Sequence, residues 1–188
     1  MRLAWSLLSA YGSGKAVIGL ANPVAPPVRV AVVEGENGRP EIAGQANFSF
    51  AYEGPPTCVH GGVIAELLDE VLGAANIVAE HPAMTGTLTV RYRKPTPLNT
   101  DLRVEARFVR VDGRKVYTWG GIYAGDILTA EADGIFIEVV PIQMLDIAES
   151  NIDSADPVML EAIRAEALRE GAASDVQRVF DPDLRPPT

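Results

Sequence analysis

The sequence predicts an α+β domain in which one long helix packs on a face of an antiparallel sheet. One observation is a run of apolar residues at helical spacing within the stretch Gly61–Val78. Another is the series of strand-like segments that follows it, with turn dipeptides such as Asp112-Gly113 between them. Because these strands follow one another along the chain, we expect a four-strand antiparallel meander after the helix.

Composition limits the classes of protein that the chain can represent. It has 188 residues, enough for one domain with a real core, and a formal net charge of −9. That charge argues against nonspecific nucleic-acid binding, which depends on cations that contact phosphates. No apolar run approaches a membrane span, and the first 20 residues lack the long apolar region of a signal peptide. We expect a cytoplasmic protein that uses no cofactor.

Two strands are expected before the helix and four after it. Asn37-Gly38 is a strong turn dipeptide, and residues 53–56 form a rigid loop that leads to the helix. His81-Pro82 predicts the end of the helix. The expected strands are residues 28–34, 41–52, 84–93, 102–108, 115–123 and 127–139.

We divide the chain into an N-terminal segment (residues 1–21), a main domain (22–140) and a C-terminal extension (141–188). In the extension, Asp156-Pro157 is typical of a helix start and Gly171 of a helix stop. We therefore predict one additional helix there, over residues 157–170.

Asp69 differs from the other two acids of the long helix. At 100° per residue, Glu66 and Glu70 lie further round the helix and have the character of solvated acids. Asp69 falls on a side made of small residues, which allows another backbone or a flat substrate to approach closely. A desolvated carboxylate in that position is a candidate base or nucleophile. The alternative is an ordinary surface acid, and residue type alone favours that alternative.

The two glycines at the start of the helix favour the functional interpretation. Gly61 and Gly62 leave backbone N–H groups unshielded at the positive end of the helix dipole, a natural oxyanion site, although close packing is an alternative reason for them. Gly61 and Asp69 lie roughly 12 Å apart along the helix, but both must come within ~3 Å of one reacting carbon. An enzyme of this design must be a homodimer, with sites shared between two helices packed antiparallel.

Two stretches carry a family resemblance. Residues 53–73 read EGPPTCVHGGVIAELLDEVLG, and residues 85–98 read TGTLTVRYRKPTPL. Together they resemble the hotdog-fold acyl-CoA thioesterases, most closely the PaaI-like branch that includes the mammalian thioesterase-superfamily members. The resemblance implies a long central helix wrapped by an antiparallel sheet, dimers that often pair into tetramers, and hydrolysis of a fatty or aromatic acyl-CoA to free acid and CoA.

The resemblance also implies roles for individual residues. Gly61 would offer its N–H to the thioester oxygen, Asp69 would act as base or nucleophile, and His60 would help to hold the thioester end. Thr85 would position water, with Thr87 a less suitable choice. Some members have Asn or Gln in the loop before the helix; the matching residue here is Gly54, so that water-binding group is missing.

Basic residues gather at two places that could hold the phosphates of CoA. The alternative is that they are solvated strand edges that deter aggregation, and the sequence does not separate the two. We keep the second helix glycine, Gly62, among the substrate-binding candidates with them. The clusters are Arg91, Arg93 and Lys94 beside Pro95, and Arg110, Arg114 and Lys115 at a hairpin.

Other reactive residues have simpler explanations. Cys58, the only cysteine, lies two residues before His60, but a lone cysteine in a strand-like approach is more often a small buried hydrophobe than a nucleophile. His81 is placed to cap the end of the helix. With two histidines in all and no ligand-like spacing, we expect no metal site.

Two other functions remain open for the same fold. One is a non-catalytic acyl-CoA-binding or regulatory protein, although such a protein has no need of a buried carboxylate. The other is an acyl hydratase or dehydratase, which would require a catalytic histidine that this chain does not place.

Overall fold

The computed structural model describes residues 17, 26, 28–139, 161, 164 and 165. Contact density divides the chain into two units, Met1–Val140 and Pro141–Thr188. The predicted N-terminal segment and the C-terminal helix at 157–170 lie outside the described residues, except for the few positions just given. The fold below is therefore that of residues 28–139.

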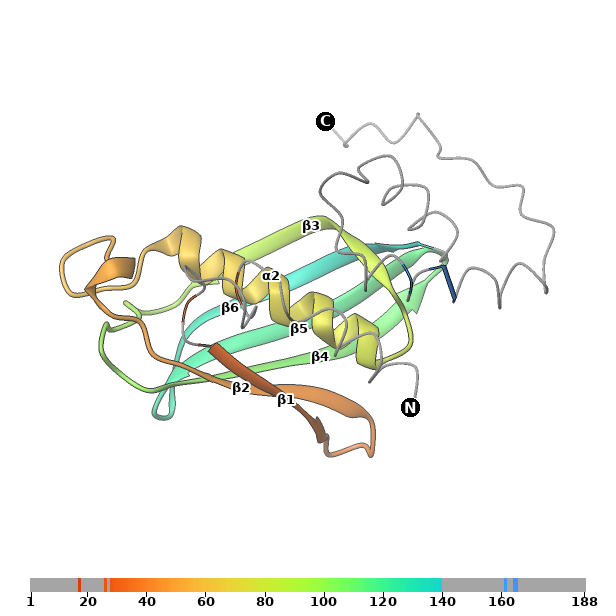
Figure 1. The fold of residues 1–188 in the computed structure, drawn as a ribbon, viewed down its shortest axis with the longest axis horizontal. Helices are drawn as coiled ribbons and strands as arrows, with labels where there is room; N and C mark the ends of the chain where they lie inside the picture. Colours follow the sequence, from red (N-terminus) through yellow and green to blue (C-terminus); the bar gives the residue numbers. More distant parts are fainter. Residues whose placement is uncertain (1–16, 18–25, 27, 140–160, 162–163, 166–188) are drawn as a thin grey trace. The chain divides into compact units, whose positions relative to one another are not determined.

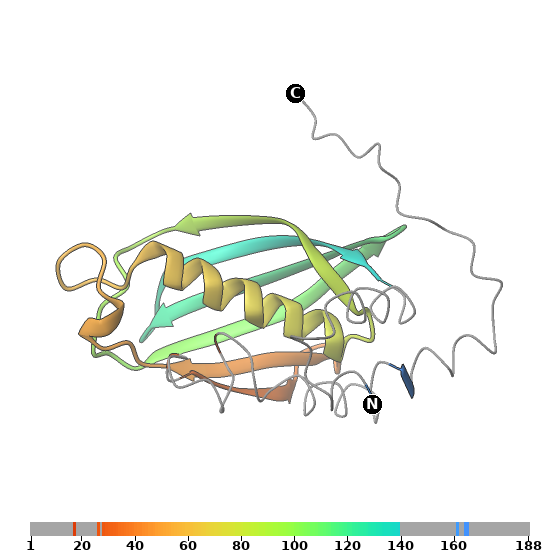
Figure 2. The same ribbon diagram turned by 45° about the horizontal axis from the view of Figure 1, so that its top comes forward.

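One helix, α2 (Gly61–Val78), crosses one face of a six-stranded antiparallel sheet (Figures 1 and 2). The sheet order is β1-β2-β4-β5-β6-β3, which puts β1 at one edge and β3 at the other. The α+β class and the limits of the helix are thus confirmed. The strands are β1 (Val28–Glu34), β2 (Pro40–Ala46), β3 (Ala83–Tyr92), β4 (Leu102–Asp112), β5 (Lys115–Ala124) and β6 (Ile127–Glu138).

The predicted four-strand meander is wrong in one respect. Strands β4, β5 and β6 do follow one another as neighbours, but β3 pairs with β6 at the far side and not with β4. The chain therefore crosses the width of this part of the sheet between β3 and β4. Local alternation cannot reveal such a crossing, because strand order depends on pairings between residues distant in sequence.

The second predicted strand was too long. β2 ends at Ala46, and residues Phe50–Tyr52 form a 3-10 turn, η1, instead of continuing the strand. Phe48 is fully buried in the core, whereas Phe50 is 68% exposed. The aromatic residues that suggested a strand therefore have other roles. Phe48 fills part of the core, and Phe50 lies in the exposed turn before the loop that leads to α2.

The helix lies close to the sheet because the sheet carries glycines beneath it. A Cβ on Gly120 would lie 2.6 Å from Leu72 of the helix, and one on Gly134 would lie 2.8 Å from the same side chain. Inward residues of the central strands alternate with outward polar ones, as in a sheet with one covered face. The core lies between α2 and this face, and its largest fully buried side chains include Leu67, Leu68, Leu72, Ile122 and Phe136.

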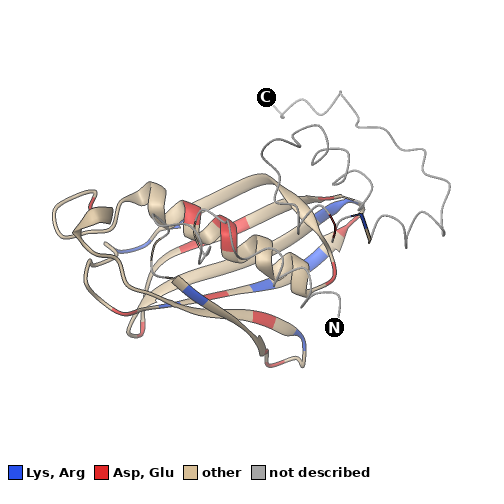
Figure 3. Ribbon diagram, viewed as in Figure 1, with Lys and Arg blue, Asp and Glu red and all other residues tan. Residues whose placement is uncertain are grey.

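Charge is distributed differently on the helix and on the sheet. All charged residues of α2 are acidic and lie between Glu66 and Glu70, whereas the strands carry both signs (Figure 3). On the outer sheet face, Arg103, Arg107 and Arg110 stack on the rings of Tyr123, Trp119 and Tyr117. Among the described residues, no helix is long and apolar enough to cross a membrane.

Candidate active site

The first turn of α2 leaves one backbone donor open. His60 is the N-cap: its ring Nδ1 accepts from the Gly62 N–H at 3.0 Å, and its carbonyl accepts from Val63 and Ile64. Within the described part of the chain, the Gly61 N–H donates to no acceptor. The predicted oxyanion donor is therefore available at Gly61, while the N–H of Gly62, a predicted substrate-binding residue, is occupied by the cap.

Tyr92, which the sequence analysis missed, fixes this end of the helix. Its hydroxyl donates to the Gly61 carbonyl at 2.8 Å, although the side chain remains 56% exposed. Gly61 also packs closely, since a Cβ there would lie 3.3 Å from the Tyr92 hydroxyl oxygen. The alternation of β3 could have identified this residue. Tyr92 lies two residues after Val90 and four after Leu88, so it is on the same face of the strand as these two residues, which pack against the core.

The structure brings Asp69 and Thr85 together. The Thr85 hydroxyl donates to Asp69 Oδ1 at 2.8 Å, which links the middle of α2 to the start of β3. Asp69 is half-buried and Thr85 is exposed in the single chain. A carboxylate held by one hydroxyl keeps its other oxygen available for a substrate or a water molecule. Thr87 is also exposed, but the described residues give it no contact with Asp69.

A β-bulge explains how one strand supplies both Tyr92 and Thr85 to the helix. The two are seven residues apart, so strict alternation would put them on opposite faces of the sheet. The register of β3 with β6 shifts between Thr85, which pairs with Phe136, and Thr87, which pairs with Ile135. Gly86 is the extra residue, and it reverses the alternation, so that both side chains face α2.

Gly86 suits the bulge because its surroundings leave little room. A Cβ there would lie 3.2 Å from the Ile135 carbonyl oxygen and 3.2 Å from Ile137 Cγ1. Bulges commonly occur next to active sites, where they redirect a side chain. The bulge thus places Thr85 beside Asp69, in a way that the alternating pattern of the sequence could not reveal.

The loop before the helix is closed tightly around His60. Gly54 N–H donates to the Cys58 carbonyl at 3.0 Å, and Thr57 N–H donates to the Glu53 carboxylate at 2.8 Å. A Cβ on Gly54 would lie only 2.7 Å from the His60 Cα. An Asn or Gln at position 54 would therefore displace the helix cap, which gives a physical reason for glycine there.

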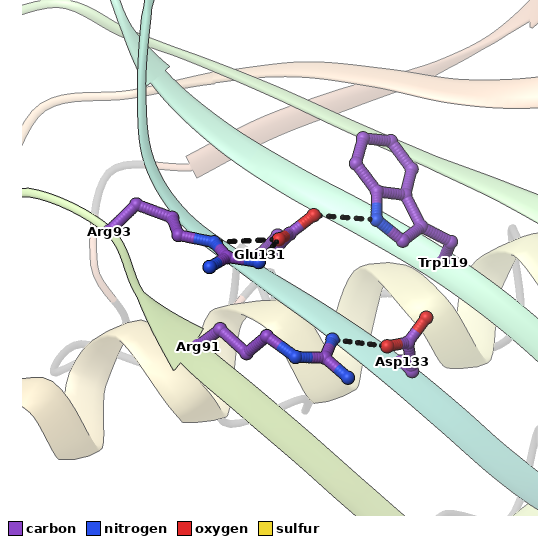
Figure 4. A network of polar contacts seen from close by, with 5 residues as sticks. All are labelled: Arg91, Arg93, Trp119, Glu131 and Asp133. Atoms are coloured by element: carbon purple, nitrogen blue, oxygen red, sulfur yellow. Dashed lines mark hydrogen bonds and ion pairs between the residues drawn. The ribbon is translucent and has the colours of Figure 1, made fainter.

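Arg91 and Arg93 each pair with a carboxylate of β6. Arg93 Nε donates to Glu131 at 2.8 Å, Glu131 also accepts from Trp119 Nε1 at 3.0 Å, and Arg91 pairs with Asp133 (Figure 4). The hydrogen bond from Arg93, followed by that from Trp119, lowers the pKa of Glu131 below its ordinary value. These exposed pairs are compatible with the alternative interpretation of the cluster, solvated strand edges that deter aggregation.

The other predicted cations lie apart from this network. Arg114 donates to the Glu138 carbonyl at 3.3 Å, and Arg110 lies 3.7 Å from Asp112. Lys94 and Lys115 are exposed. Neither lysine forms an ion pair within residues 28–139, so both stay candidates for phosphate binding.

Cys58 and His81 take structural positions. Cys58 is half-buried and forms an isolated β-bridge with Pro97. The His81 N–H donates to the Asn76 carbonyl at 2.9 Å, which closes the end of the helix as predicted. The His81 ring contacts Glu138 at 2.9 Å and stacks on Phe108. No three metal-ligating side chains group together in the described part of the chain.

Comparison with known proteins agrees with this fold. The sequence profile of the thioesterase superfamily matches residues 57–131, which contain α2, β3, the Asp69–Thr85 contact and most of the sheet. Over this stretch the chain is similar to the thioesterase superfamily. A crystal structure of another thioesterase superfamily protein is 38% identical, with a TM-score of 0.61 over 66% of this chain and 63% of that chain.

The hotdog domain also has a curated relative of assigned activity. Acyl-coenzyme A thioesterase THEM4 of Xenopus laevis is 37% identical over 91 residues, which are 47% of this chain and 41% of that protein. The chain thus spans less than half the length of this relative. A mutant of the phenylacetic acid degradation protein PaaI of Thermus thermophilus shares the fold, at 18% identity and a TM-score of 0.52 over 60% of this chain and 93% of that chain.

Proposed function

We propose that this chain hydrolyses acyl-CoA thioesters to a free acid and CoA. One observation carries the proposal: Thr85 holds the Asp69 carboxylate beside an edge strand whose other end contacts Gly61, the residue with the open N–H. The superfamily of the domain and the acyl-CoA thioesterase named among its relatives support the same conclusion.

The free edge of β3 supports a site shared between two protomers. Among the described strands, β3 pairs only with β6, so its other edge is open for a second copy. Thr85 near its start contacts Asp69, and Tyr92 at its end contacts Gly61. If two β3 strands pair antiparallel about a two-fold axis, the end of one lies beside the start of the other. The partner's Gly61 then approaches Asp69.

In the proposed reaction, Asp69 attacks the thioester carbonyl carbon or removes a proton from the water that attacks it. The N–H of the partner's Gly61 stabilises the negative charge on the carbonyl oxygen. The carbon–sulfur bond then breaks, and CoA leaves as a thiolate that needs no strong general acid. In the nucleophilic route, water finally releases the acid from an anhydride with Asp69. Lys94 and Lys115 are the proposed contacts to CoA phosphates.

The test replaces Asp69 with asparagine, which keeps the size and removes the charge. The release of free CoA thiol measures hydrolysis of a panel of short, medium, long and aromatic acyl-CoAs. The rate should fall ~100- to 10,000-fold for Asp69→Asn. Glu66→Gln, on the exposed side of the same helix, is the matched control and should keep wild-type rates. An Asp69→Asn dimer with unchanged turnover would refute the proposal.

The second candidate is a non-catalytic acyl-CoA-binding or regulatory protein. Gly54 favours it, because the loop leaves no room for the water-binding side chain that some members have there. Binding of acyl-CoA, measured by calorimetry, with no release of thiol across the whole panel would establish this alternative.

A cytoplasmic location and a pairing of dimers into tetramers stay predictions.

A further inference from the structure

Gly73 lies in the middle of α2, and no neighbour within residues 28–139 requires a glycine there. A glycine in a helix interior costs stability relative to alanine, so a compensating role is expected. A Cβ on Gly73 would meet one atom within 4 Å, Phe136 Cε1 at 3.9 Å, which is an ordinary contact. In contrast, a Cβ on Gly120 would collide with Leu72 and the Glu105 carbonyl, and one on Gly134 would collide with Phe136 and Leu72.

Asn76, one turn further along α2, is the second observation. Its side chain is fully buried, and among the described residues neither its amide nitrogen nor its amide oxygen has a hydrogen-bond partner. Buried amides are almost always paired, so an orphaned one indicates a missing ligand or solvent molecule. Side chains on a helix lean toward its N-terminus, which directs the Asn76 amide back over the turn that contains Gly73.

Asp69, Gly73 and Asn76 follow one another along one side of the helix. They are spaced four and three residues apart, so they are surface neighbours. Asp69 and Gly73 are half-buried, whereas Asn76 is fully buried. The row therefore runs inward from the carboxylate, past Gly73, to the unpaired amide of Asn76 at its inner end.

We propose that the acyl chain of the substrate lies along this row, and that the Asn76 amide hydrogen-bonds a hydroxyl oxygen near its far end. This inference rests on the proposed thioesterase function and names its substrate class, CoA thioesters of medium-chain hydroxyacyl groups. A hydroxyl both donates and accepts, which matches the two unused atoms of the amide. From Asp69 to Asn76 the helix rises about 10 Å, a distance that an extended medium-length chain spans.

The experiment compares octanoyl-CoA with ω-hydroxyoctanoyl-CoA as substrates. The wild-type dimer should have at least a tenfold higher kcat/KM for the hydroxylated thioester, because a polar site left unpaired discriminates strongly. Asn76→Leu replaces the amide with an apolar group of similar size and should fold, since it removes an unsatisfied buried group. The preference should disappear or reverse in this variant, while hydrolysis of octanoyl-CoA remains.

Gly73 is tested with the same pair of thioesters and a shorter one, butanoyl-CoA. Gly73→Val should lower kcat/KM for both eight-carbon substrates at least tenfold and leave that for butanoyl-CoA within threefold. Size-exclusion chromatography with light scattering follows the oligomer. If Gly73→Val changes the dimer mass instead of the chain-length profile, the space receives a partner helix and the inference is wrong.

The outcomes separate this inference from the proposed function. If no acyl-CoA is hydrolysed by the wild-type dimer, the thioesterase proposal itself fails. If hydrolysis depends on Asp69 but Asn76→Leu leaves the ratio of the two eight-carbon substrates unchanged, only the inference about Asn76 fails.

Discussion

The two faces of the sheet handle polar groups in opposite ways. On the outer face, Arg91 and Arg93 each pair with a carboxylate of β6, and three further arginines stack on aromatic rings. On the face toward α2, the Asn76 amide, the Thr118 hydroxyl and the Gly61 N–H have no hydrogen-bond partner within residues 28–139. The outer face completes its contacts within the protomer, while the inner side lacks groups that must come from elsewhere.

The difference between the two sheet faces changes which residues are the stronger candidates for function. Clustered arginines were one candidate site in the sequence, but ion pairs on an exposed face are solvated and contribute little. An unpaired donor or amide is costly when buried, so it persists where a ligand or partner completes it. The following predictions test whether function depends on the inner side alone.

The largest effect is expected from removing the Gly61 N–H. Gly61→Pro deletes this donor at the first helical position, where proline is tolerated, and His60 already has the extended backbone, at ψ 133, that a residue before proline requires. Acyl-CoA hydrolysis should fall ~100- to 1,000-fold relative to Gly61→Ala. The alanine variant adds the same Cβ near Tyr92 but keeps the N–H, so it is the matched control.

Mixing variants tests whether each site is shared. In a dimer of one Gly61→Pro chain and one Asp69→Asn chain, one of the two sites has both intact groups. Subunits exchanged to random pairing should regain about a quarter of the wild-type activity, while either variant alone stays inactive. A mixture without recovered activity would place both groups in one chain and contradict the shared site.

A smaller loss is expected when the Thr85 hydroxyl is removed. Thr85→Val keeps the shape of the side chain and deletes the 2.8 Å hydrogen bond to Asp69. A hydrogen bond to a charged group contributes about 1.5–3 kcal/mol, which corresponds to roughly 10- to 100-fold in rate. Thr85→Ser should retain most of the activity. Equal rates for Val and Ser variants would show that the hydroxyl has no part in the reaction.

Alanine should have opposite effects at Gly86 and Gly73. Gly86→Ala puts a Cβ within 3.2 Å of the Ile135 carbonyl and should destabilise the fold by about 1–3 kcal/mol. Gly73→Ala meets no such obstacle and should stabilise it by up to about 1 kcal/mol. Urea unfolding at one fixed protein concentration measures both. A stabilised Gly86→Ala variant would mean that the bulge is not constrained as described.

The smallest effect is expected on the outer face. The pKa of Glu131 is lowered in the folded state, so the carboxylate stabilises the fold above its ordinary pKa of 4.5, and this stabilisation is lost as the pH falls through the folded pKa. Because Arg93 is half exposed, water screens the pair, and Glu131→Gln should cost at most about 1 kcal/mol at pH 7. Denaturation curves should converge with wild type in acid, and hydrolysis should remain unchanged.

Local patterns predicted the helix and most strands of this domain. Helical spacing and the turn dipeptides gave α2 and the hairpins, since both are properties of neighbouring residues. Such patterns could not predict three features: the partner of β3, the end of β2 at Ala46 and the contact of Thr85 with Asp69. They depend on long-range pairing, on the burial of Phe48 and on one extra residue in a strand. The candidate pair Gly61 and Asp69 came from helix arithmetic, but Tyr92 required the fold.

The extra residue at Gly86 has a consequence for reading related sequences. In this chain seven positions separate Thr85 from Tyr92, an odd number, and the bulge absorbs the difference. A relative that has lost one residue here needs no bulge, because a regular strand then sends both side chains to the same face. A one-residue gap at this point of an alignment would thus be compatible with both contacts, Thr85 to Asp69 and Tyr92 to Gly61. The spacing between the threonine and the tyrosine can therefore be used to find these contacts in related sequences.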